Sequence, residues 1–263
     1  MRLDRIIAEK SLSPSREQAK KLIEQGLVTV NGKTVTKPSY EAKEDDDIQV
    51  TGELCRYVGR GGLKLEGALK AFGVDVSGLV CADIGASTGG FTDCMLQNGA
   101  SLVYAVDVGH GQLDKKLLDD PRVINIEGVN ARYIEPGLFE KKPALMTCDL
   151  SFISLRLVVD KLIPCLDEGG RIITLIKPQF EAGKSAIGKN GIVKDKKAHI
   201  RLLDELSAYF FGIGLIIKTI THSPIKGGDG NIEYIALLEK AGDCNVIMPD
   251  SKSIADAAFS KLK

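Results

Sequence analysis

Four ionisable residues lie in the sequence where a helix and several strands would open onto a ligand crevice. Asp149 and Lys177 each follow an apolar run, Glu233 lies near the start of another, and Lys64 lies on a helix that precedes them. The carboxyl ends of parallel strands form the ligand crevice of an open α/β sheet, so Asp149 and Lys177 should point into one pocket. Amines beside carboxylates can hold, orient or move a proton. The structural alternative is that Asp149 caps a helix beginning near Ser151 and that Lys177 pairs with a surface acid.

A glycine-rich stretch that could bind a nucleotide-like ligand runs from Val80 to Asp107. An apolar run, a glycine turn, a helix and a second apolar run follow one another, which predicts the strand, turn, helix and strand of a nucleotide-binding unit. Glycines in such a turn let the backbone approach a ligand closely. The segments are Gly78–Ile84, Gly85–Gly90, Phe91–Gln97 and Leu102–Val106.

Three ligands compete for this turn. A dinucleotide fingerprint requires G-x-G-x-x-G, and Ser87 stands where its second glycine should be. A phosphate-binding loop requires G-x-x-x-x-G-K-[ST], and Gly85–Thr92 fits this pattern except that Phe91 replaces the lysine. Without that ammonium nothing would neutralise terminal phosphates. S-adenosylmethionine, an adenosyl ligand with no phosphate, fits best, and a purely structural glycine turn is the remaining alternative.

Each part of an adenosyl ligand has a candidate partner. Asp83 would help to orient the methionine end, and Asp107, at the end of the second strand, would hold two ribose hydroxyls. Asn130 ends the segment expected beside the adenine ring. The backbone of the turn would pack against the ligand at Gly85, Ala86, Ser87, Gly89, Gly90 and Phe91.

Helical and strand patterns alternate after residue 62, which predicts an α/β domain with a largely parallel sheet. The polar segment Gln179–Asn190 is long enough to act as a lid. The predicted helices are Leu63–Phe72, Ile153–Leu166, Asp195–Phe211 and Ile254–Leu262, and the further strands are Val123–Ile126, Ala144–Asp149, Arg171–Ile176, Leu215–Ile220 and Ile232–Leu238.

The first 50 residues predict a compact α+β module. Apolar residues recur at helical spacing over 3–9 and 15–25, and Asn31-Gly32 is a typical hairpin turn dipeptide before a last strand at 48–50. Residues 1–40 contain eight Lys and Arg against four acids. Arg16, Lys20 and Lys21 should share one helix face, although such a bare charge pattern is more often a solvated surface.

The sequence motifs of this module are more specific evidence of its function than its charge. R-L-D at residues 2–4, and S-R-x-x-A-K-x-L-I-x-x-G-x-V-x-V-N-G from Ser15 to Gly32, resemble the RNA-binding domain named after ribosomal protein S-four. The resemblance implies that Arg5, Arg16, Lys20 and Lys21 face RNA phosphates, where positive charge gives affinity without sequence preference.

Both halves of the chain together resemble the TlyA ribosomal RNA methyltransferases, a family also called hemolysin A. The motifs are R-G-G-L-K-L, C-D-L-S-F-I-S, I-K-P-Q-F-E and S-P-I-K-G-G-D-G-N-I-E-Y. This resemblance implies a Rossmann-like, FtsJ-like methyltransferase fold and 2′-O-methylation of cytidine ribose in small- and large-subunit ribosomal RNA. It implies a catalytic tetrad of Lys64, Asp149, Lys177 and Glu233, with Arg60 among the RNA contacts. One departure is Tyr57 in the linker, where a tryptophan is expected.

In this reaction a ribose hydroxyl must attack the sulfonium methyl in line, so the protein supplies mainly geometry and help with one proton. Lys177 is the residue expected to contact the hydroxyl. Asp149 and Glu233 beside it would favour its charged form. Lys177 is therefore expected to orient and polarise the hydroxyl rather than to act as a free amine base.

The composition of the chain limits which other functions it could have. The chain has 263 residues and zero net charge, and no apolar run reaches the roughly 20 residues of a membrane helix. A secretion signal is absent, and the six cysteines (55, 81, 94, 148, 165 and 244) are scattered, which predicts free thiols, a cytoplasmic location and no metal site. A membrane-active haemolysin and a non-catalytic ribosome assembly factor remain as alternatives.

The predicted organisation is an RNA-binding domain (1–54), a linker (55–62), a methyltransferase domain (63–241) and a tail (242–263). The expected partners are ribosomal RNA or ribosomal subunits, with S-adenosylmethionine as cofactor and with neither a membrane nor an obligate protein partner.

Overall fold

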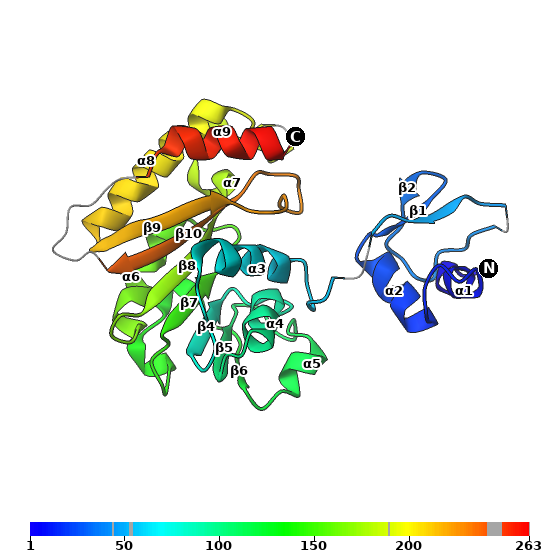
Figure 1. The fold of residues 1–263 in the computed structure, drawn as a ribbon, viewed down its shortest axis with the longest axis horizontal. Coiled ribbons are helices and arrows are strands. Elements are labelled where there is room, and N and C mark those ends of the chain that lie inside the picture. The colour runs from blue at the N-terminus through cyan, green and yellow to red at the C-terminus, as the bar shows by residue number, and fades with distance from the viewer. Residues whose placement is uncertain (44, 53–54, 189, 241–248, 263) are drawn as a thin grey trace. The chain divides into compact units, whose positions relative to one another are not determined.

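The structure, a computed structural model, describes residues 1–43, 45–52, 55–188, 190–240 and 249–262. The chain divides into two compact units, Met1–Arg56 and Tyr57–Lys263 (Figure 1). Cys244 and the predicted boundary between residues 241 and 242 lie outside the described residues. Within the described part of the chain, no helix combines the length and apolar character that crossing a membrane would require.

The first unit packs two helices on a small antiparallel sheet. Helices α1 (Leu3–Glu9) and α2 (Arg16–Glu24) cover strands in the order β2-β1-β3. A serine caps α2, because Ser15 Oγ accepts a hydrogen bond from Gln18 N at 3.2 Å. The strands are β1 (Val28–Val30), β2 (Lys33–Thr34) and β3 (Ile48–Val50).

The predicted hairpin turn joins β1 to β2. Asn31 and Gly32 both have positive φ, at 49° and 74°, which is the conformation that an Asn-Gly turn provides. The first unit has its own hydrophobic core. Its buried residues are Leu3, Ile6, Ile7, Ala19, Leu22, Ile23, Val28, Val30, Ala42 and Ile48.

The second unit is built on a seven-stranded sheet in the order β6-β5-β4-β7-β8-β10-β9. The first five strands in that order run parallel, and β10 lies antiparallel between β8 and β9. The strands are β4 (Val80–Ile84), β5 (Leu102–Val106), β6 (Val123–Ile126), β7 (Leu145–Cys148), β8 (Arg171–Ile176), β9 (Leu215–His222) and β10 (Tyr234–Lys240).

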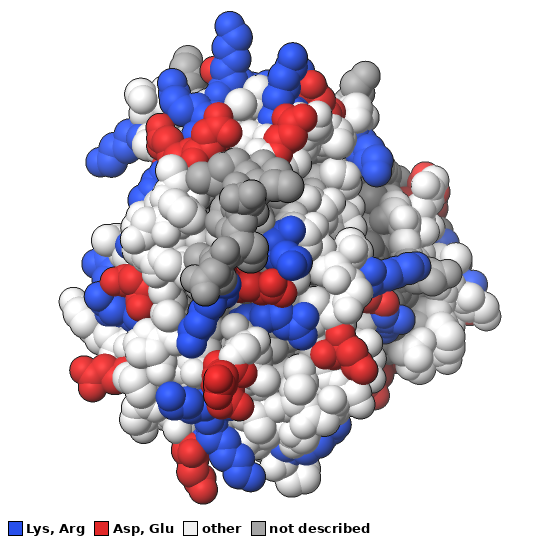
Figure 2. Space-filling model, turned by 60° about the vertical axis from the view of Figure 1, so that its left-hand side comes forward, with Lys and Arg blue, Asp and Glu red and all other residues white. Residues whose placement is uncertain are grey.

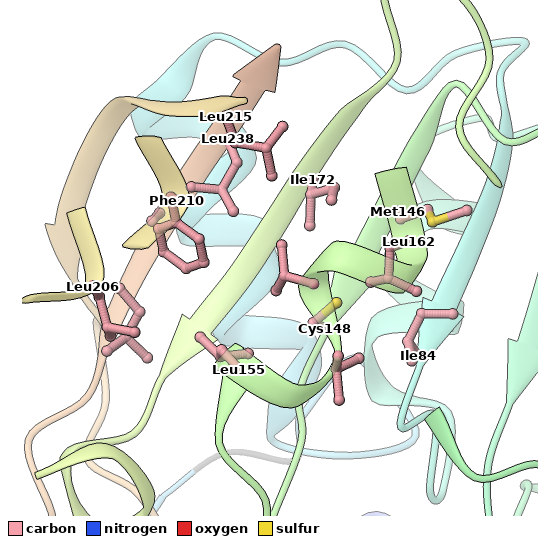
Figure 3. Packing of buried hydrophobic residues seen from close by; sticks show 14 of the residues in the cluster. Ile84, Met146, Cys148, Leu155, Leu162, Ile172, Leu206, Phe210, Leu215 and Leu238 are labelled. Carbon is pink, nitrogen blue, oxygen red and sulfur yellow. The ribbon is translucent and has the colours of Figure 1, made fainter. Parts of the chain in front are cut away.

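Helices cover both faces of this sheet (Figure 1). Helices α3 (Gly61–Phe72) and α4 (Gly90–Gln97) lie on one face. The other face packs against α6 (Val159–Leu162) and α8 (Lys196–Gly212). Ile84 on β4, Leu162 on α6 and Phe210 on α8 belong to one apolar cluster that extends along this face (Figure 3). This α/β fold is the one predicted from the sequence.

Several predicted elements differ in detail. The helix predicted over 153–166 is three short pieces, η3 (Leu155–Leu157), α6 and η4 (Ile163–Cys165), and Pro164 lies in the first turn of η4, where a helix tolerates its missing N–H. The predicted loop 179–190 begins inside α7 (Pro178–Glu181) and includes η5 (Lys184–Ala186).

Three short elements were not predicted, namely α5 (Lys115–Leu118), η1 (Ala131–Tyr133) and η2 (Pro136–Leu138). Helix α9 (Ser251–Lys261) matches the helix predicted near the carboxyl end of the chain. It packs on α8 and β9, and Ala258 is fully buried in the main core.

Candidate active site

The glycine turn between β4 and α4 needs the conformations that glycine allows. Gly85 and Gly89 have φ of 86° and 92°. A Cβ at Gly85 would lie 2.9 Å from the backbone oxygen of Asp149, and one at Gly89 would collide with Leu117. Side chains at these two positions would therefore both strain the backbone and displace its neighbours.

Asp107 lines a cavity of about 560 Å³ at the carboxyl ends of β4, β5 and β7. Its carboxylate accepts hydrogen bonds from Ser87 N at 2.8 Å and from Gly109 N at 2.7 Å, one on each oxygen. Because a carboxylate oxygen has two lone pairs, each can still accept a hydrogen bond from a ligand. Asn130 lines the same cavity, and its Oδ1 accepts from Arg132 N.

The walls of this cavity are mostly apolar. Six apolar side chains could cover both faces of a flat ligand ring. They are Ile84, Val106, Val108, Val129, Leu150 and Ile153. A carboxylate that can accept two hydrogen bonds, set beside apolar walls, suits a ribose joined to an adenine.

Asp83 lies at the end of β4 and is fully buried. Its Oδ2 accepts from the backbone and hydroxyl of Thr92 at 2.9 and 2.7 Å, and its Oδ1 accepts from Thr147 Oγ1 at 3.0 Å. Burial raises the pKa of Asp83 to about 7, against the effect of these hydrogen bonds. The residue lines a second, smaller cavity of about 250 Å³.

Lys177 lines this smaller cavity, and its ammonium is held by two groups. Nζ lies 2.6 Å from Asp149 Oδ1 and donates a hydrogen bond to Ser151 Oγ at 2.9 Å. Asp149 and Ser151 line both cavities, so the lysine lies beside the junction of the two. Oδ1 of Asp149 is buried and has the Lys177 ammonium as its charged partner. A carboxylate has several lone pairs, so Asp149 could also accept a hydrogen bond from a ligand hydroxyl.

Lys64 and Glu233 form the second ion pair of the predicted tetrad. Lys64 Nζ donates to Glu233 Oε2 at 2.6 Å, and both side chains are buried. The pairing of β10 with β8 brings this ion pair to Lys177. Tyr234 lies opposite Ile176 at the end of the antiparallel ladder, and Glu233 and Lys177 are the adjacent residues just beyond it. The structure thus brings the four predicted residues together as two lysine–carboxylate pairs.

A close approach of backbone fixes the Glu233 side chain. A Cβ at Gly227 would lie 2.4 Å from Glu233 Oε1, so only glycine leaves room for the carboxylate where it stands. The turn at Gly227 is closed by its N–H, which donates to the carbonyl of Asn231 at 2.9 Å.

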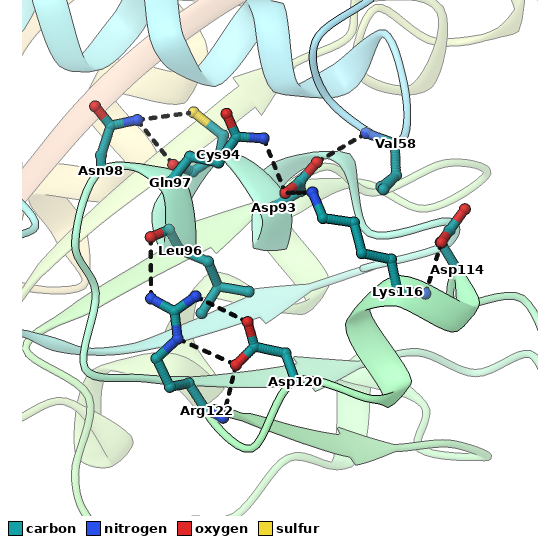
Figure 4. Close-up of polar contacts among 10 residues, drawn as sticks. All are labelled: Val58, Asp93, Cys94, Leu96, Gln97, Asn98, Asp114, Lys116, Asp120 and Arg122. Carbon is teal, nitrogen blue, oxygen red and sulfur yellow. Dashed lines mark hydrogen bonds and ion pairs between the residues drawn. The ribbon is translucent and has the colours of Figure 1, made fainter. Parts of the chain in front are cut away.

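The segment before α3 is bound to α4 by a buried carboxylate (Figure 4). Asp93 accepts from Val58 N at 2.9 Å and pairs with Lys116 at 3.0 Å. Tyr57, found where tryptophan is expected, is buried against Gly62, where a Cβ would collide with its ring. These contacts hold the segment beside the smaller cavity, which Gly59, Arg60 and Gly61 line.

The rest of the predicted cofactor residues lie at the two cavities or at the start of α4. Gly85 and Ser87 line both cavities, and Ala86, Gly90 and Phe91 line the smaller one. Gly89 is the residue before α4 and packs against Leu117 instead of lining either cavity.

The four basic residues predicted to contact RNA within the first unit are all exposed. Two of them have acidic partners: Arg5 pairs with Glu9 at 2.8 Å, and Arg16 pairs with the buried Asp4 at 2.9 Å. Arg2 also binds Asp4, and the two guanidiniums hold the pKa of that carboxyl below its usual range. Lys20 and Lys21 lie on α2 beside Arg16.

Two residues at the site were not predicted. Ser151 contacts Lys177, and Glu181 binds the segment that follows Asp149. Both lie inside motifs quoted above, C-D-L-S-F-I-S and I-K-P-Q-F-E, so their position beside Asp149 and Lys177 was the available signal.

Comparisons with known proteins agree with this geometry. Residues 57–240 match the FtsJ-like methyltransferase family, and residues 1–48 match the S4 domain. The chain is 39% identical over 92% of its length, and 91% of the relative, to the 16S/23S rRNA (cytidine-2′-O)-methyltransferase TlyA of Mycobacterium tuberculosis. It is 42% identical over 90% of its length, and 98% of the relative, to Hemolysin A of Brachyspira hyodysenteriae.

A solved structure of a Streptococcus thermophilus protein that carries the name hemolysin is also similar. It shares 44% identity and a TM-score of 0.79, covering 99% of this chain and 96% of that one. From its matched domains, its relatives over most of their length and its seven-stranded sheet, this chain belongs to the TlyA family of FtsJ-like methyltransferases that carry an S4 domain.

Proposed function

We propose that this protein is an S-adenosylmethionine-dependent enzyme that methylates the 2′-hydroxyl of cytidine ribose in ribosomal RNA. The observation that carries the proposal is the Lys177 ammonium, bound by Asp149 and Ser151 beside the junction of two cavities. Its relatives named as rRNA (cytidine-2′-O)-methyltransferases support the choice of substrate.

The larger cavity would hold the adenosyl part of the cofactor. Asp107 would accept hydrogen bonds from the two ribose hydroxyls, and Asn130 would lie near the adenine. The smaller cavity, with Asp83 and the start of α4, would hold the methionine part. When bound there, S-adenosylmethionine supplies an electrophilic methyl group and a good leaving group.

The tetrad residues orient the attacking hydroxyl. An ammonium has three N–H donors, and Lys177 directs two of them at Asp149 and Ser151, which leaves one for the ribose oxygen. Asp149, whose Oδ1 lies 2.6 Å from that ammonium, would accept a hydrogen bond from the hydroxyl. Holding the oxygen from two sides fixes its direction of attack, which is the main contribution a protein makes to such a transfer.

The second pair supports the first. Lys64 and Glu233 neutralise one another in a buried place where either charge alone would be costly. Glu233 adjoins Lys177 at the end of the β8–β10 ladder, so the second pair places a negative charge beside the Lys177 ammonium.

The S4 domain and Arg60 would bind the RNA backbone. Lys20 and Lys21 are exposed on one helix, and Arg60 lines the cavity that contains Lys177. The target nucleotide must leave its helix to reach the methyl group, at a cost of a few kcal/mol that such phosphate contacts can offset.

Substitution of Lys177 separates this chemistry from binding. Lys177→Ala should lower the single-turnover rate of methyl transfer to ribosomal subunits by roughly a hundredfold or more, because both position and charge are lost. Lys177→Arg keeps the charge but has a larger, planar head group, so it should be almost as slow. Cofactor affinity measured by calorimetry should stay within about threefold, since the ribose and adenine contacts remain.

The exposed Lys252→Ala on α9 is the matched control. Near-normal transfer by Lys177→Ala would remove Lys177 from the mechanism and leave Lys64 as the candidate.

A further inference from the structure

The loop of residues 149–155, which joins β7 to η3, carries two groups that contact Lys177. Asp149 and Ser151 lie at its start, and Ser154 and Leu155 lie at its end. Its middle lies outside any helix or strand, and there Phe152 packs on Phe180 of α7, with ring centroids 5.2 Å apart.

The far end of this loop is bound by Glu181. Oε2 accepts from Ser154 Oγ at 2.7 Å, and Oε1 accepts from the Leu155 N–H at 2.7 Å. Arg156 lies 3.6 Å from the same carboxylate. Glu181 is only 7% exposed, and burial raises its pKa. A carboxylate in such a place needs its hydrogen bonds to be satisfied, and here both oxygens accept a short one.

Glu181 and Lys177 are parts of one short segment. Lys177 is the residue before α7, and Glu181 is the last residue of that single-turn helix. The loop therefore contacts this segment at both ends: Asp149 and Ser151 meet Lys177, and Ser154 and Leu155 meet Glu181.

The loop also holds a strained residue between its two ends. Phe152 has φ of 64°, in the left-handed region that a bulky aromatic side chain rarely adopts. Such a conformation costs on the order of 1–3 kcal/mol and persists only where the surroundings fix it. The side chain of Phe152 is 89% exposed and contacts Phe180, so its own packing supplies only part of that restraint. The contacts with Glu181 supply the anchor on the carboxyl-terminal side.

We propose that Glu181 is a positioning residue for methyl transfer: by binding Ser154 and Leu155 it holds the 149–155 loop so that Asp149 and Ser151 stay on the Lys177 ammonium. This inference rests on the proposed methyl transfer. The glycine turn, Asp107 and Asn130 do not touch Glu181, so the cofactor contacts that they make should persist without it.

Paired substitutions of the two carboxylates that meet Arg156 test the role. Glu181→Ala should lower the single-turnover rate at saturating cofactor by about tenfold to a hundredfold, because the groups around Lys177 shift. Cofactor affinity should change by less than about threefold. Glu205 also binds Arg156, at 3.2 Å, but is half-exposed and makes no contact with the loop, so Glu205→Ala is the matched control and should keep the wild-type rate.

Two more variants separate positioning from folding. Glu181→Gln can accept from Leu155 N and donate to Ser154 Oγ, so it should stay within about threefold of the wild-type rate. If Glu181 acts by placing Ser151, the double variant Glu181→Ala/Ser151→Ala should lose less of the methyl-transfer rate than the product of the two separate losses. A role confined to stability would give independent, multiplicative losses and a rate that follows the folded fraction.

Each outcome bears on one claim. A wild-type chain that transfers no methyl overturns the proposed function and this inference with it. An active wild type with an equally active Glu181→Ala, or a Glu181→Ala loss matched by Glu205→Ala, overturns this inference alone. If Glu181→Ala fails to fold, Ser154→Ala replaces it: a loss of about threefold or more with an unchanged melting temperature supports the role, and a wild-type rate overturns it.

Discussion

Asp83 is a fully buried carboxyl beneath the glycine turn, where Thr92 and Thr147 supply its hydrogen bonds. Burial raises its pKa from 3.8 to about 7, so the folded chain keeps a proton that the unfolded chain releases. Stability from this group is fully present below about pH 4 and falls as the pH rises towards 7, above which the group has no further effect.

Asp83→Asn removes this titration and keeps the size of the side chain. Between pH 5 and pH 7 the free energy of unfolding of the wild type should fall by about 2 kcal/mol relative to that of the variant. Denaturant unfolding of both proteins at the two pH values measures the difference, and His199, which is buried in both, cancels in the comparison. Parallel stability curves would mean that Asp83 is already ionised in the fold at pH 5.

At this scale the sequence predicted best those residues whose places follow from strand ends. Asp149 and Lys177 end parallel strands, so the sheet alone brings them to one edge. Ser151 and Glu181 could not be predicted in the same way, because their contacts depend on how an irregular loop folds back onto a single helical turn. No periodicity in the sequence encodes that path.

Turns place the site as much as the strands do. The loop before β10 brings the backbone of Gly227 to Glu233, and the glycine turn brings that of Gly85 to Asp149, each leaving no room for a Cβ. A side chain at either glycine would therefore displace a residue of the tetrad, Glu233 in one case and Asp149 in the other.

Gly227→Ala tests this use of a turn. The new Cβ would lie 2.4 Å from Glu233 Oε1, so the carboxylate must turn away from Lys64. Methyl transfer in single-turnover assays should slow by about tenfold or more, while cofactor affinity stays unchanged. Gly228→Ala is the matched control, because a Cβ there meets nothing within 4 Å and should leave the rate at the wild-type value. Equal rates for the two variants would show that the position of Glu233 does not matter.

Elements with regular patterns were predicted closely, and irregular ones were not. The glycine turn, the parallel strands and the Asn-Gly hairpin have strong local signals, and the structure has them where expected. The run from 153 to 166 has the apolar content of a helix, but Pro164 and the need to present Leu155 to Glu181 break it into short turns. Tertiary contacts override a helical pattern of that length.

The molecule as a whole joins an RNA-binding unit to a methyltransferase unit, and its net charge is zero. Figure 2 shows basic and acidic side chains interspersed over one face, without a single-sign field. Attraction to RNA must therefore come from local groups, of which Lys20 and Lys21 on α2 are exposed and adjacent.

Removing both charges should weaken RNA binding in a salt-dependent way. The double variant Lys20→Ala/Lys21→Ala should reduce the slope of log affinity against log salt by about one to two, because each phosphate contact contributes roughly 0.7–0.9. Filter binding to ribosomal subunits over a salt series measures the slope, with Lys252→Ala on α9 as the control. An unchanged slope would mean that this face of α2 is only solvated.

The most direct test of the account identifies the methylated atom. Ribosomal subunits from a strain that lacks the enzyme are incubated with the protein and methyl-labelled S-adenosylmethionine, and the RNA is digested to nucleosides for mass spectrometry. The account predicts label in 2′-O-methylcytidine with the wild type and label that forms roughly a hundredfold or more slower with Lys177→Ala, which should still bind the cofactor and the subunits. Label on a base, or no label from a folded protein that binds both ligands, would contradict it.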